Sequence, residues 1–261
     1  MRIIVPVKQV PNTTDVRIDP KTGTLIREGV ESIVNPEDLN AVEAGLKLRE
    51  KHGGEVIVLS MGPPQAEEAL REVLAMGVDE AYLLTDKALA GADTLATAYS
   101  LSRAIRSIGE FDIVICGRQA VDGDTAQVGP QVAEFLKLPQ VTYVRKIDIQ
   151  NGSVVAERLL EDGIEVIKAQ LPALLTVTKE VNHPRYPTMG GIRAAHREKE
   201  IHFWGAKEFE AESWRIGLEG SPTWVKKTFS PPPKAPGQAL EGTPKEVGKE
   251  LIRRLVEKNL I

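Results

Sequence analysis

Residues 117–130, with the sequence GRQAVDGDTAQVGP, carry polar groups that suit the binding of a small anionic ligand. They follow an apolar, strand-like run and contain the turn dipeptide Asp122-Gly123. Asp124 and Gln127 stand three residues apart, which fits a capping box and predicts a helix that starts near Asp124. The first turn of a helix offers unpaired backbone N–H groups and the positive end of a dipole, so phosphate is the ligand that this pattern favours.

The same residues leave a ligand-free alternative open. An ordinary capped turn between a strand and a helix has a similar composition. The carboxylates of Asp122 and Asp124 repel a phosphate unless they point away, cap the helix or bind ribose hydroxyls. The chain has neither the G-x-x-x-x-G-K-[ST] nor the G-x-G-x-x-G fingerprint. Residue types alone therefore support a phosphate site and a plain turn about equally.

Residues for nucleophilic or metal chemistry are sparse. The four histidines lack zinc-ligand spacing, and no G-x-S-x-G elbow occurs. The single cysteine, Cys116, ends an apolar run and is expected to be a small core residue. We therefore expect no catalytic residue and no metal site.

Composition narrows the class of protein. The 261 residues are 42% hydrophobic but only 5% aromatic, which predicts an aliphatic core of the kind that buried parallel strands form. The net charge of -4 argues against a nucleic-acid partner. No apolar run approaches the ~18 residues of a membrane span, and no cleavable leader pattern opens the chain. A cytoplasmic protein without membrane insertion is expected.

Strands and helices alternate along the first part of the chain, which favours an α/β fold with a parallel sheet and right-handed crossovers. The expected strands are 2–7, 55–60, 80–85, 112–116 and 141–147, and the expected helices start after Asn35, at 65, after Asp93 and at 124. Ligands bind beyond the carboxyl ends of such strands. The segments at those ends are 6–9, 35–38, 61–64 and 117–129.

The pattern changes after residue 150. Residues 152–158, 164–169 and 174–178 resemble antiparallel strands with turns between them, which predicts a small antiparallel extension. Residues 12–29 suggest a loop or small hairpin, and 181–191 show no period. We expect an α/β nucleotide-binding domain over 1–220 and, over 221–261, a Pro-rich arm ending in an amphipathic helix at 244–260. By its residues alone, this arm could fold back on its own domain or embrace another chain.

Several motifs together make the sequence resemble the β subunit of electron transfer flavoproteins over nearly its whole length. They include the opening Ile4–Lys8, Asn35-Pro36 before the first helix, and Ala75-Met76-Gly77. The nucleotide loop 117–129, the signature at 158–176 and the Asn182–Pro187 loop complete the set.

The resemblance implies an adenine nucleotide alpha hydrolase-like fold and a heterodimer with a larger α subunit, whose C-terminal domain carries the redox FAD. The β subunit would bind a second adenine nucleotide, and its C-terminal arm would grip the α subunit. The site residues carried over are Pro6, Asn35, Asp38, Met61, Asp122, Gly123, Asp124, Thr125, Ala126, Gln127, Val128, Gly129 and Pro130.

The resemblance also implies a recognition loop at 182–198 that docks partner dehydrogenases. Its docking residues would be Arg185, Tyr186 and Met189, with Met189 as the apolar anchor. A quinone oxidoreductase is the other kind of partner implied.

Ordinary members of this family hold AMP, whereas others hold a second FAD and bifurcate electrons from NADH toward quinone- or ferredoxin-linked acceptors. Gly123, Ala126 and Val128 are small or weakly polar and resemble the FAD-binding type; Gly123 also permits close backbone approach to a diphosphate. We therefore expect FAD, with AMP as the alternative. Two other classes stay open: an enzyme that adenylates a substrate, and a nucleotide-binding stress protein without a redox role.

Overall fold

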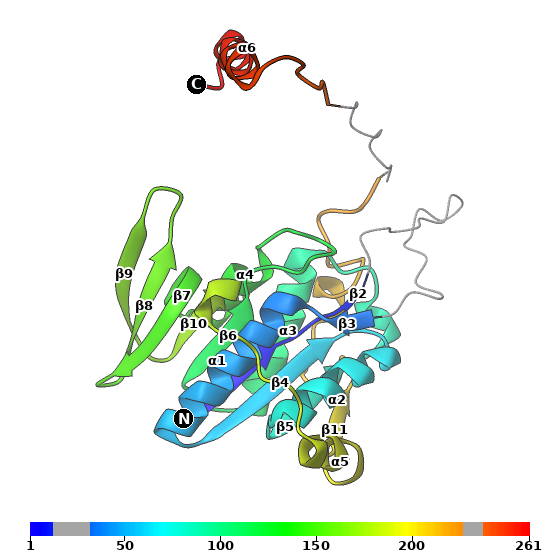
Figure 1. Ribbon diagram of the computed structural model, residues 1–261. Helices are drawn as coiled ribbons and strands as arrows, with labels where there is room; N and C mark the ends of the chain where they lie inside the picture. The colour runs from blue at the N-terminus through cyan, green and yellow to red at the C-terminus, as the bar shows by residue number, and fades with distance from the viewer. Residues whose placement is uncertain (13–31, 227–236) are drawn as a thin grey trace. The chain divides into compact units, whose positions relative to one another are not determined.

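The computed structural model describes residues 1–12, 32–226 and 237–261. The chain divides into two compact units, Met1–Lys226 and Lys227–Ile261 (Figure 1). The predicted loop or hairpin at 12–29 lies outside the described residues apart from Asn12, as does the 227–236 part of the arm.

A nine-stranded sheet, in the order β11-β5-β4-β1-β6-β10-β7-β8-β9, forms the centre of the first unit (Figure 1). Its strands from β11 to β7 pair in parallel, while β8 and β9 add an antiparallel extension. The strands are β1 Arg2–Pro6, β4 Glu55–Met61, β5 Glu80–Leu84, β6 Ile113–Gly117, β7 Gln140–Gln150, β8 Ser153–Leu159, β9 Ile164–Gln170, β10 Ala173–Val177 and β11 Ile201–Trp204. A small separate sheet pairs β2 Gln9–Pro11 with β3 Ser32–Val34.

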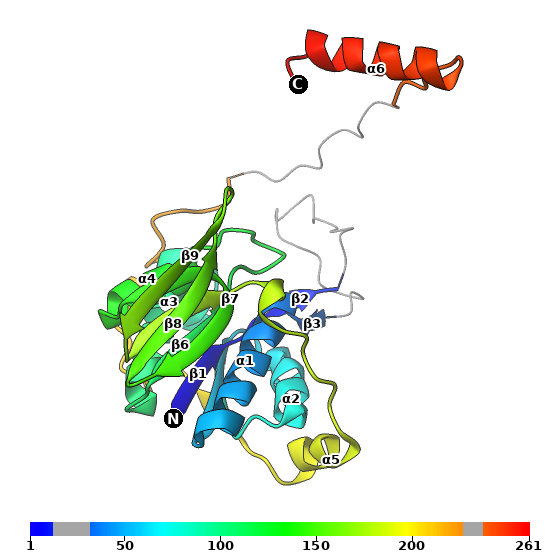
Figure 2. The same ribbon diagram turned by 60° about the vertical axis from the view of Figure 1, so that its left-hand side comes forward.

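Helices cover both faces of the sheet (Figure 2). Helices α1 Pro36–His52 and α2 Glu67–Met76 pack on one face, and α3 Thr94–Ile108 and α4 Val128–Leu136 pack on the other. Helix α5 Met189–Arg197 packs against α2. Single turns of 3₁₀ helix are η1 Pro64–Ala66, η2 Lys87–Leu89, η3 Lys179–Val181 and η4 Ser213–Arg215.

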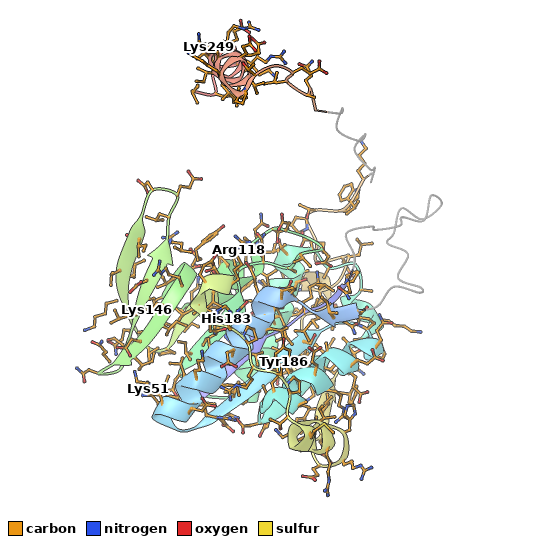
Figure 3. All side chains as sticks on the ribbon, viewed as in Figure 1. Lys51, Arg118, Lys146, His183, Tyr186 and Lys249 are labelled. Carbon is orange, nitrogen blue, oxygen red and sulfur yellow. The ribbon has the colours of Figure 1, made fainter. Side chains whose placement is uncertain are left out.

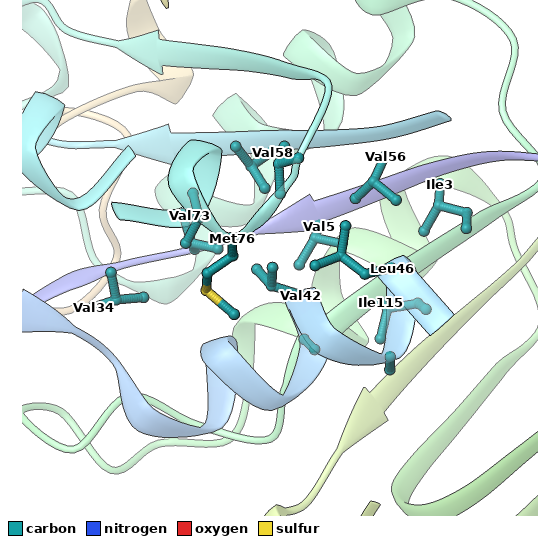
Figure 4. Packing of buried hydrophobic residues seen from close by; sticks show 14 of the residues in the cluster. Ile3, Val5, Val34, Val42, Leu46, Val56, Val58, Val73, Met76 and Ile115 are labelled. Carbon is teal, nitrogen blue, oxygen red and sulfur yellow. The ribbon is translucent and has the colours of Figure 1, made fainter. Parts of the chain in front are cut away.

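The core is aliphatic because the central strands are buried on both faces. In β1, Ile3 and Val5 point to the layer of α1 and α2, while Ile4 between them points to the opposite layer. Figure 4 shows Val42 of α1 and Val73 of α2 against the first of these faces. The sequences of these strands are therefore continuous runs of apolar residues, as is typical of parallel strands buried on both faces.

The predicted parallel sheet is confirmed, but three features differ from expectation. Strand β10, expected to be antiparallel, lies between β6 and β7 and is parallel to both. All five of its residues are buried, so its side-chain pattern was that of an interior strand. Helix α5 and strand β11 were not predicted, because Pro and Gly residues before α5 masked the helical period.

The order of the strands defines a switch point at β1. From β1 the chain goes through α1 to β4 on one side, and later, after α3, returns to β6 on the other side. The connections on the two sides of β1 diverge, and a crevice forms where their loops leave the carboxyl edge. This edge is the expected position of a ligand.

The second unit contains helix α6, Pro244–Glu257. Thr243 and Glu246 form a capping box at its start. Its apolar side chains Leu251, Ile252 and Val256 are about half exposed. An amphipathic helix with an uncovered apolar side agrees with the expectation of a partner for this arm, which stays a prediction.

Candidate functional site

The loop that leaves β6 is anchored to the start of α1 by Asn35. The Asn35 side chain donates Nδ2–H to the carbonyl of Gln119 at 2.9 Å and accepts the N–H of Val121 at 3.1 Å. Asn35 immediately precedes α1, as expected, but its side chain makes no capping hydrogen bond to the helix. Both ends of the amide bond the loop instead. Asn35 therefore positions the candidate site instead of the helix.

The helix after this loop begins later than its sequence suggested. Helix α4 starts at Val128, and Gln127 precedes it without a side-chain cap. The expected capping box and the start near Asp124 are wrong. The backbones of Asp124 and Ala126 lie in the left-handed region, with φ of 50° and 53°, which a helix cannot contain. The Asp124 carboxylate accepts the side-chain amide of Gln119.

The backbone between the loop and α4 presents a run of unpaired donors. Within the described residues, the N–H groups of 125–129 have no hydrogen-bond partner. Ala126 has positive φ and Gln127 is right-handed, with φ of -101° and ψ of -30°. Successive residues of opposite hand turn their N–H groups toward one centre, and such concavities bind anions. The positive end of α4 adds to the same attraction.

Lys8 pairs with the carboxylate of Asp122, whose negative charge would otherwise repel a phosphate. Its Nζ donates to both carboxylate oxygens of Asp122, at 2.7 and 2.8 Å, and the Asp122 side chain is only 17% exposed. The ion pair joins the segment after β1 to the loop after β6, on the two sides of the switch point. Sequence analysis missed Lys8 as a site residue, although it was the sole cation in the segment after the first strand.

Asp38 joins the start of α1 to the segment after β1 by a hydrogen bond to Lys8. It lies in the first turn of α1, is 7% exposed, and accepts the backbone N–H of Lys8 at 2.8 Å. Burial raises the pKa of its carboxyl to about 7, against the opposing effect of hydrogen bonds from Asn35 and Lys8. Burial, with the Asp38 charge, also raises the pKa of the Cys116 thiol, so Cys116 is an inert core residue as expected.

Glycines at two positions permit close approach of the backbone. A Cβ on Gly117 would lie 2.2 Å from Oδ1 of Asp38, and one on Gly129 would lie 2.6 Å from Cγ2 of Thr176. A Cβ on Gly123 would meet no atom within 4 Å, so no protein contact requires glycine there. The use of Gly123 for approach to a diphosphate stays a prediction.

The remaining expected site residues lie along the same edge. Pro6 and Met61 end the adjacent strands β1 and β4, and Pro130 is in the first turn of α4. Thr125 is exposed in the loop, and Gln127 accepts the hydroxyl of Thr94 at 3.0 Å. The fold thus gathers all the residues expected from the resemblance at one edge.

A second site, expected from the resemblance to dock partners, begins at Arg185. Its guanidinium bonds both carboxylate oxygens of Glu43, at 2.7 and 3.1 Å, and also bonds Glu50 at 2.5 Å. Glu43 is almost fully buried, and these carboxylates raise the pKa of Arg185 further. Arg185 therefore holds the 182–188 segment on α1, and a docking role for it stays a prediction.

The next two docking residues are open to solvent. Tyr186 is 91% and Met189 is 85% exposed, and Figure 3 labels Tyr186. Helix α5 is nevertheless firmly placed: a Cβ on Gly191 would lie 2.1 Å from the carbonyl oxygen of Ala75 in α2. An open groove of about 590 Å³ lies between these helices. Exposed apolar groups on a rigid support are typical of a docking surface.

Replacing Arg185 with alanine is expected to destabilise the first unit by about 3 kcal/mol, because it leaves the buried Glu43 carboxylate unpaired. Thermal unfolding and the rate of proteolysis within 182–188 measure the effect. Lys47→Ala is the matched control, since Lys47 is exposed and lies 3.8 Å from the same carboxylate. Equal unfolding temperatures for the two variants would contradict the clamp.

Residues 1–12, 32–226 and 237–261 contain no group of three or more His, Cys, Asp or Glu side chains arranged to hold a metal ion. In those ranges, no helix combines the length and apolar character needed to cross a membrane.

Comparison with known proteins agrees with this architecture. The profile of the electron transfer flavoprotein domain matches residues 22–203. The chain is 56% identical to the electron transfer flavoprotein subunit beta of Thermoanaerobacterium thermosaccharolyticum, with both chains covered completely. It is 53% identical to the caffeyl-CoA reductase–Etf complex subunit CarD of Acetobacterium woodii and 43% identical to the acryloyl-CoA reductase electron transfer subunit gamma of Anaerotignum propionicum, again over the full length of all chains. Identity at this level over the whole length, on an α/β fold with its polar loops at the switch point, shows that the chain belongs to the electron transfer flavoprotein family, as a β-subunit member.

Proposed function

We propose that this chain binds FAD at the carboxyl edge of its sheet and, as one half of a heterodimer with an electron transfer flavoprotein α subunit, takes part in flavin-based electron bifurcation. The observation that carries the proposal is the run of unpaired N–H groups at 125–129, at the positive end of α4. In the proposed complex, electrons pass from NADH or an acyl-CoA-type dehydrogenase to a quinone- or ferredoxin-linked acceptor.

The residues present fit an adenine nucleotide. The N–H groups of 125–129 would hold its phosphates, and Lys8 neutralises the carboxylate of Asp122 in the same loop. Asn35 and Asp38 keep the two loops at a fixed separation. Bound FAD supplies the redox chemistry; this chain binds the cofactor, orients it and sets its surroundings.

Two considerations favour FAD over AMP. Relatives named as subunits of caffeyl-CoA reductase–Etf and acryloyl-CoA reductase complexes align with the whole chain, which supports a β subunit that works together with reductases of CoA esters. Gly123 has no side chain and Ala126 has a small one, so the backbone of the phosphate loop can approach a ligand with two phosphates closely.

Counting nucleotides in the purified heterodimer tests the proposal. Two FAD and no AMP per heterodimer are expected after mild acid release and chromatography. One FAD with one AMP would support the second candidate function, a non-bifurcating carrier with a structural nucleotide. A preparation with no nucleotide beyond the α-subunit FAD, and no uptake of either one, would overturn the site and favour a role without bound nucleotide.

The α subunit is the partner that the C-terminal unit suits. Helix α6 leaves Leu251, Ile252 and Val256 exposed on one side, where another chain could bury them. Near the end of the first unit, the N–H and hydroxyl of Thr223 bond Asp93. We therefore propose that the arm packs on the α subunit.

The exposed Met189 is the proposed anchor for a partner dehydrogenase or quinone oxidoreductase. Met189→Glu is expected to slow electron transfer from such a partner at least tenfold, because a charge at the centre of an apolar contact costs on the order of 2 kcal/mol. The unfolding temperature and flavin content of the heterodimer should not change. Phe203→Glu, at an apolar residue half exposed on β11, is the control. An equal loss in both variants would contradict specific docking at Met189.

A further inference from the structure

Met189, the first residue of α5, carries an oxidisable sulfur atom that the fold leaves open to solvent. The chain has four methionines and one cysteine. Met189 is 85% exposed, whereas Met76 and Cys116 are 6% and 7% exposed. Met1 and Met61 are only partly exposed, and each packs against one of the two core layers. Because oxidation of sulfur side chains follows their access to solvent, a dissolved oxidant reaches Met189 first.

The surroundings of Met189 leave its side chain without a packing role in the fold. It belongs to neither of the two core layers that the described residues form. Gly190 follows it directly, and a Cβ built there would meet no atom within 4 Å. Tyr186, three residues earlier, is itself almost fully exposed. A chemical change at the Met189 sulfur therefore alters the surface and leaves the interior of the first unit as it is.

The backbone that carries Met189 is fixed on both sides. Thr188 caps α5, because its hydroxyl accepts the N–H of Gly191 at 3.0 Å. At the other end of the helix, the Arg71 guanidinium of α2 donates to the carbonyl of Ala195. Helix α5 therefore presents the side chain of Met189 at one defined point of the surface. A change in its polarity is felt there by any partner, since the helix is not free to turn it away.

Hydrogen peroxide is an oxidant that converts such a thioether to a sulfoxide. A lone pair of Sδ attacks one peroxide oxygen, an S–O bond forms and the O–O bond breaks. The second oxygen takes up a proton and leaves as water, so the sulfur loses two electrons and the peroxide gains them. The product is a polar side chain with a hydrogen-bond acceptor at its tip, and sulfoxide reductases reverse the change.

We propose that Met189 is a reversible oxidation site and that its sulfoxide weakens the docking of partner dehydrogenases on α5. The inference rests on the proposed docking role of Met189 and adds a modification that controls it. A thioether is readily buried against an apolar partner surface, whereas an S–O group buried there without a hydrogen-bond donor is unfavourable. Leucine has nearly the same volume and apolar character but cannot be oxidised in this way, which provides the matched variant.

Peroxide treatment of the purified heterodimer tests the oxidation site. The protein is incubated with dilute hydrogen peroxide, the peroxide is removed with catalase, and peptide mass spectrometry measures the oxygen gained at each methionine. We expect Met189 to be oxidised about tenfold faster than Met76, the buried methionine that serves as internal control. The unfolding temperature and the flavin content should not change. Equal oxidation rates for Met189 and Met76 would overturn the proposal.

Electron transfer with an untreated acyl-CoA-type dehydrogenase tests the effect on docking. Each heterodimer is compared with its own untreated sample, so that differences in starting rate between variants do not enter. The oxidised wild type should transfer electrons about tenfold more slowly at low partner concentration, the size expected for one buried polar group without a partner. Sulfoxide reductases should restore the rate. Met189→Leu should lose nothing on treatment, and the control Met61→Leu should lose as much as the wild type.

The results separate this modification from the docking role beneath it. Full oxidation of Met189 without slower transfer, in a protein where Met189→Glu does slow it, overturns the oxidation control and leaves docking in place. Unchanged transfer in both the oxidised protein and Met189→Glu overturns the docking role as well. An equal loss in Met189→Leu and in the wild type would assign the damage to another residue and would also overturn the proposal.

Discussion

Gly117→Ala is expected to destabilise the first unit by about 3 kcal/mol and to lower its unfolding temperature by roughly 8 °C. The added Cβ would lie 2.2 Å from Oδ1 of Asp38 and 2.8 Å from both the backbone N of Asp38 and the carbonyl carbon of Glu37. The end of β6 and the first turn of α1 must then separate. Because the nucleotide loop leaves β6 at this residue, nucleotide affinity should fall at least tenfold as well.

Gly123→Ala is the matched control for this substitution. It lies in the same loop, but its Cβ would meet no atom within 4 Å and its φ is not in the left-handed region. Its unfolding temperature should equal that of the wild type, because surface substitutions free of such contacts change stability by at most about 0.5 kcal/mol. Calorimetry measures both variants. Similar stability of Gly117→Ala and Gly123→Ala would contradict the close packing of β6 on α1.

Asp38→Asn is expected to remove a large part of the pH dependence of stability. Burial raises the pKa of Asp38 to about 7, so the folded protein holds its proton up to that pH, whereas an unperturbed aspartate has a pKa of 3.8. The folded state thus binds more protons than the unfolded state between these values, and the free energy of unfolding falls as the pH rises through this window. A shift of this size corresponds to at most about 4 kcal/mol.

Chemical denaturation at several pH values between 4 and 8 measures this effect. The wild type should lose stability with rising pH, and Asp38→Asn should show a flatter profile that crosses it. Asp148→Asn is the control, since this exposed carboxylate has its pKa lowered to about 2 by Gln150 and Lys51 and so titrates below the window. Parallel profiles for the wild type and Asp38→Asn would show that Asp38 does not titrate there.

The position of the site follows from local sequence. Alternating apolar runs and amphipathic segments predicted a parallel sheet, and the carboxyl ends of its strands are at one edge by geometry. The polar loop 117–130 and the segment at 35–38 therefore had to meet. Neither inference required a contact between distant residues. The structure confirms the sheet and places these segments together.

The details within the loop did not follow from local sequence. Asp124 and Gln127 match a capping box, yet the backbone at Asp124 is left-handed and its carboxylate bonds Gln119. A capped helix start and an extended loop differ by only about 1 kcal/mol in local preference, so a few tertiary bonds decide between them. Here the bonds of Asn35 to the loop, made across more than eighty residues of chain, decide for the loop.

Ion pairs between residues far apart in the chain also determine which charged side chains have a partner. The sequence left the charges of Arg185 and Asp122 without known partners, whereas in the structure Arg185 pairs with Glu43 and Asp122 pairs with Lys8. The α/β class, the edge at which a ligand can bind and the family resemblance all follow from the order of residues along the chain. Which N–H groups stay unpaired and which charges are neutralised depends instead on partners that the fold brings together from distant parts of the chain.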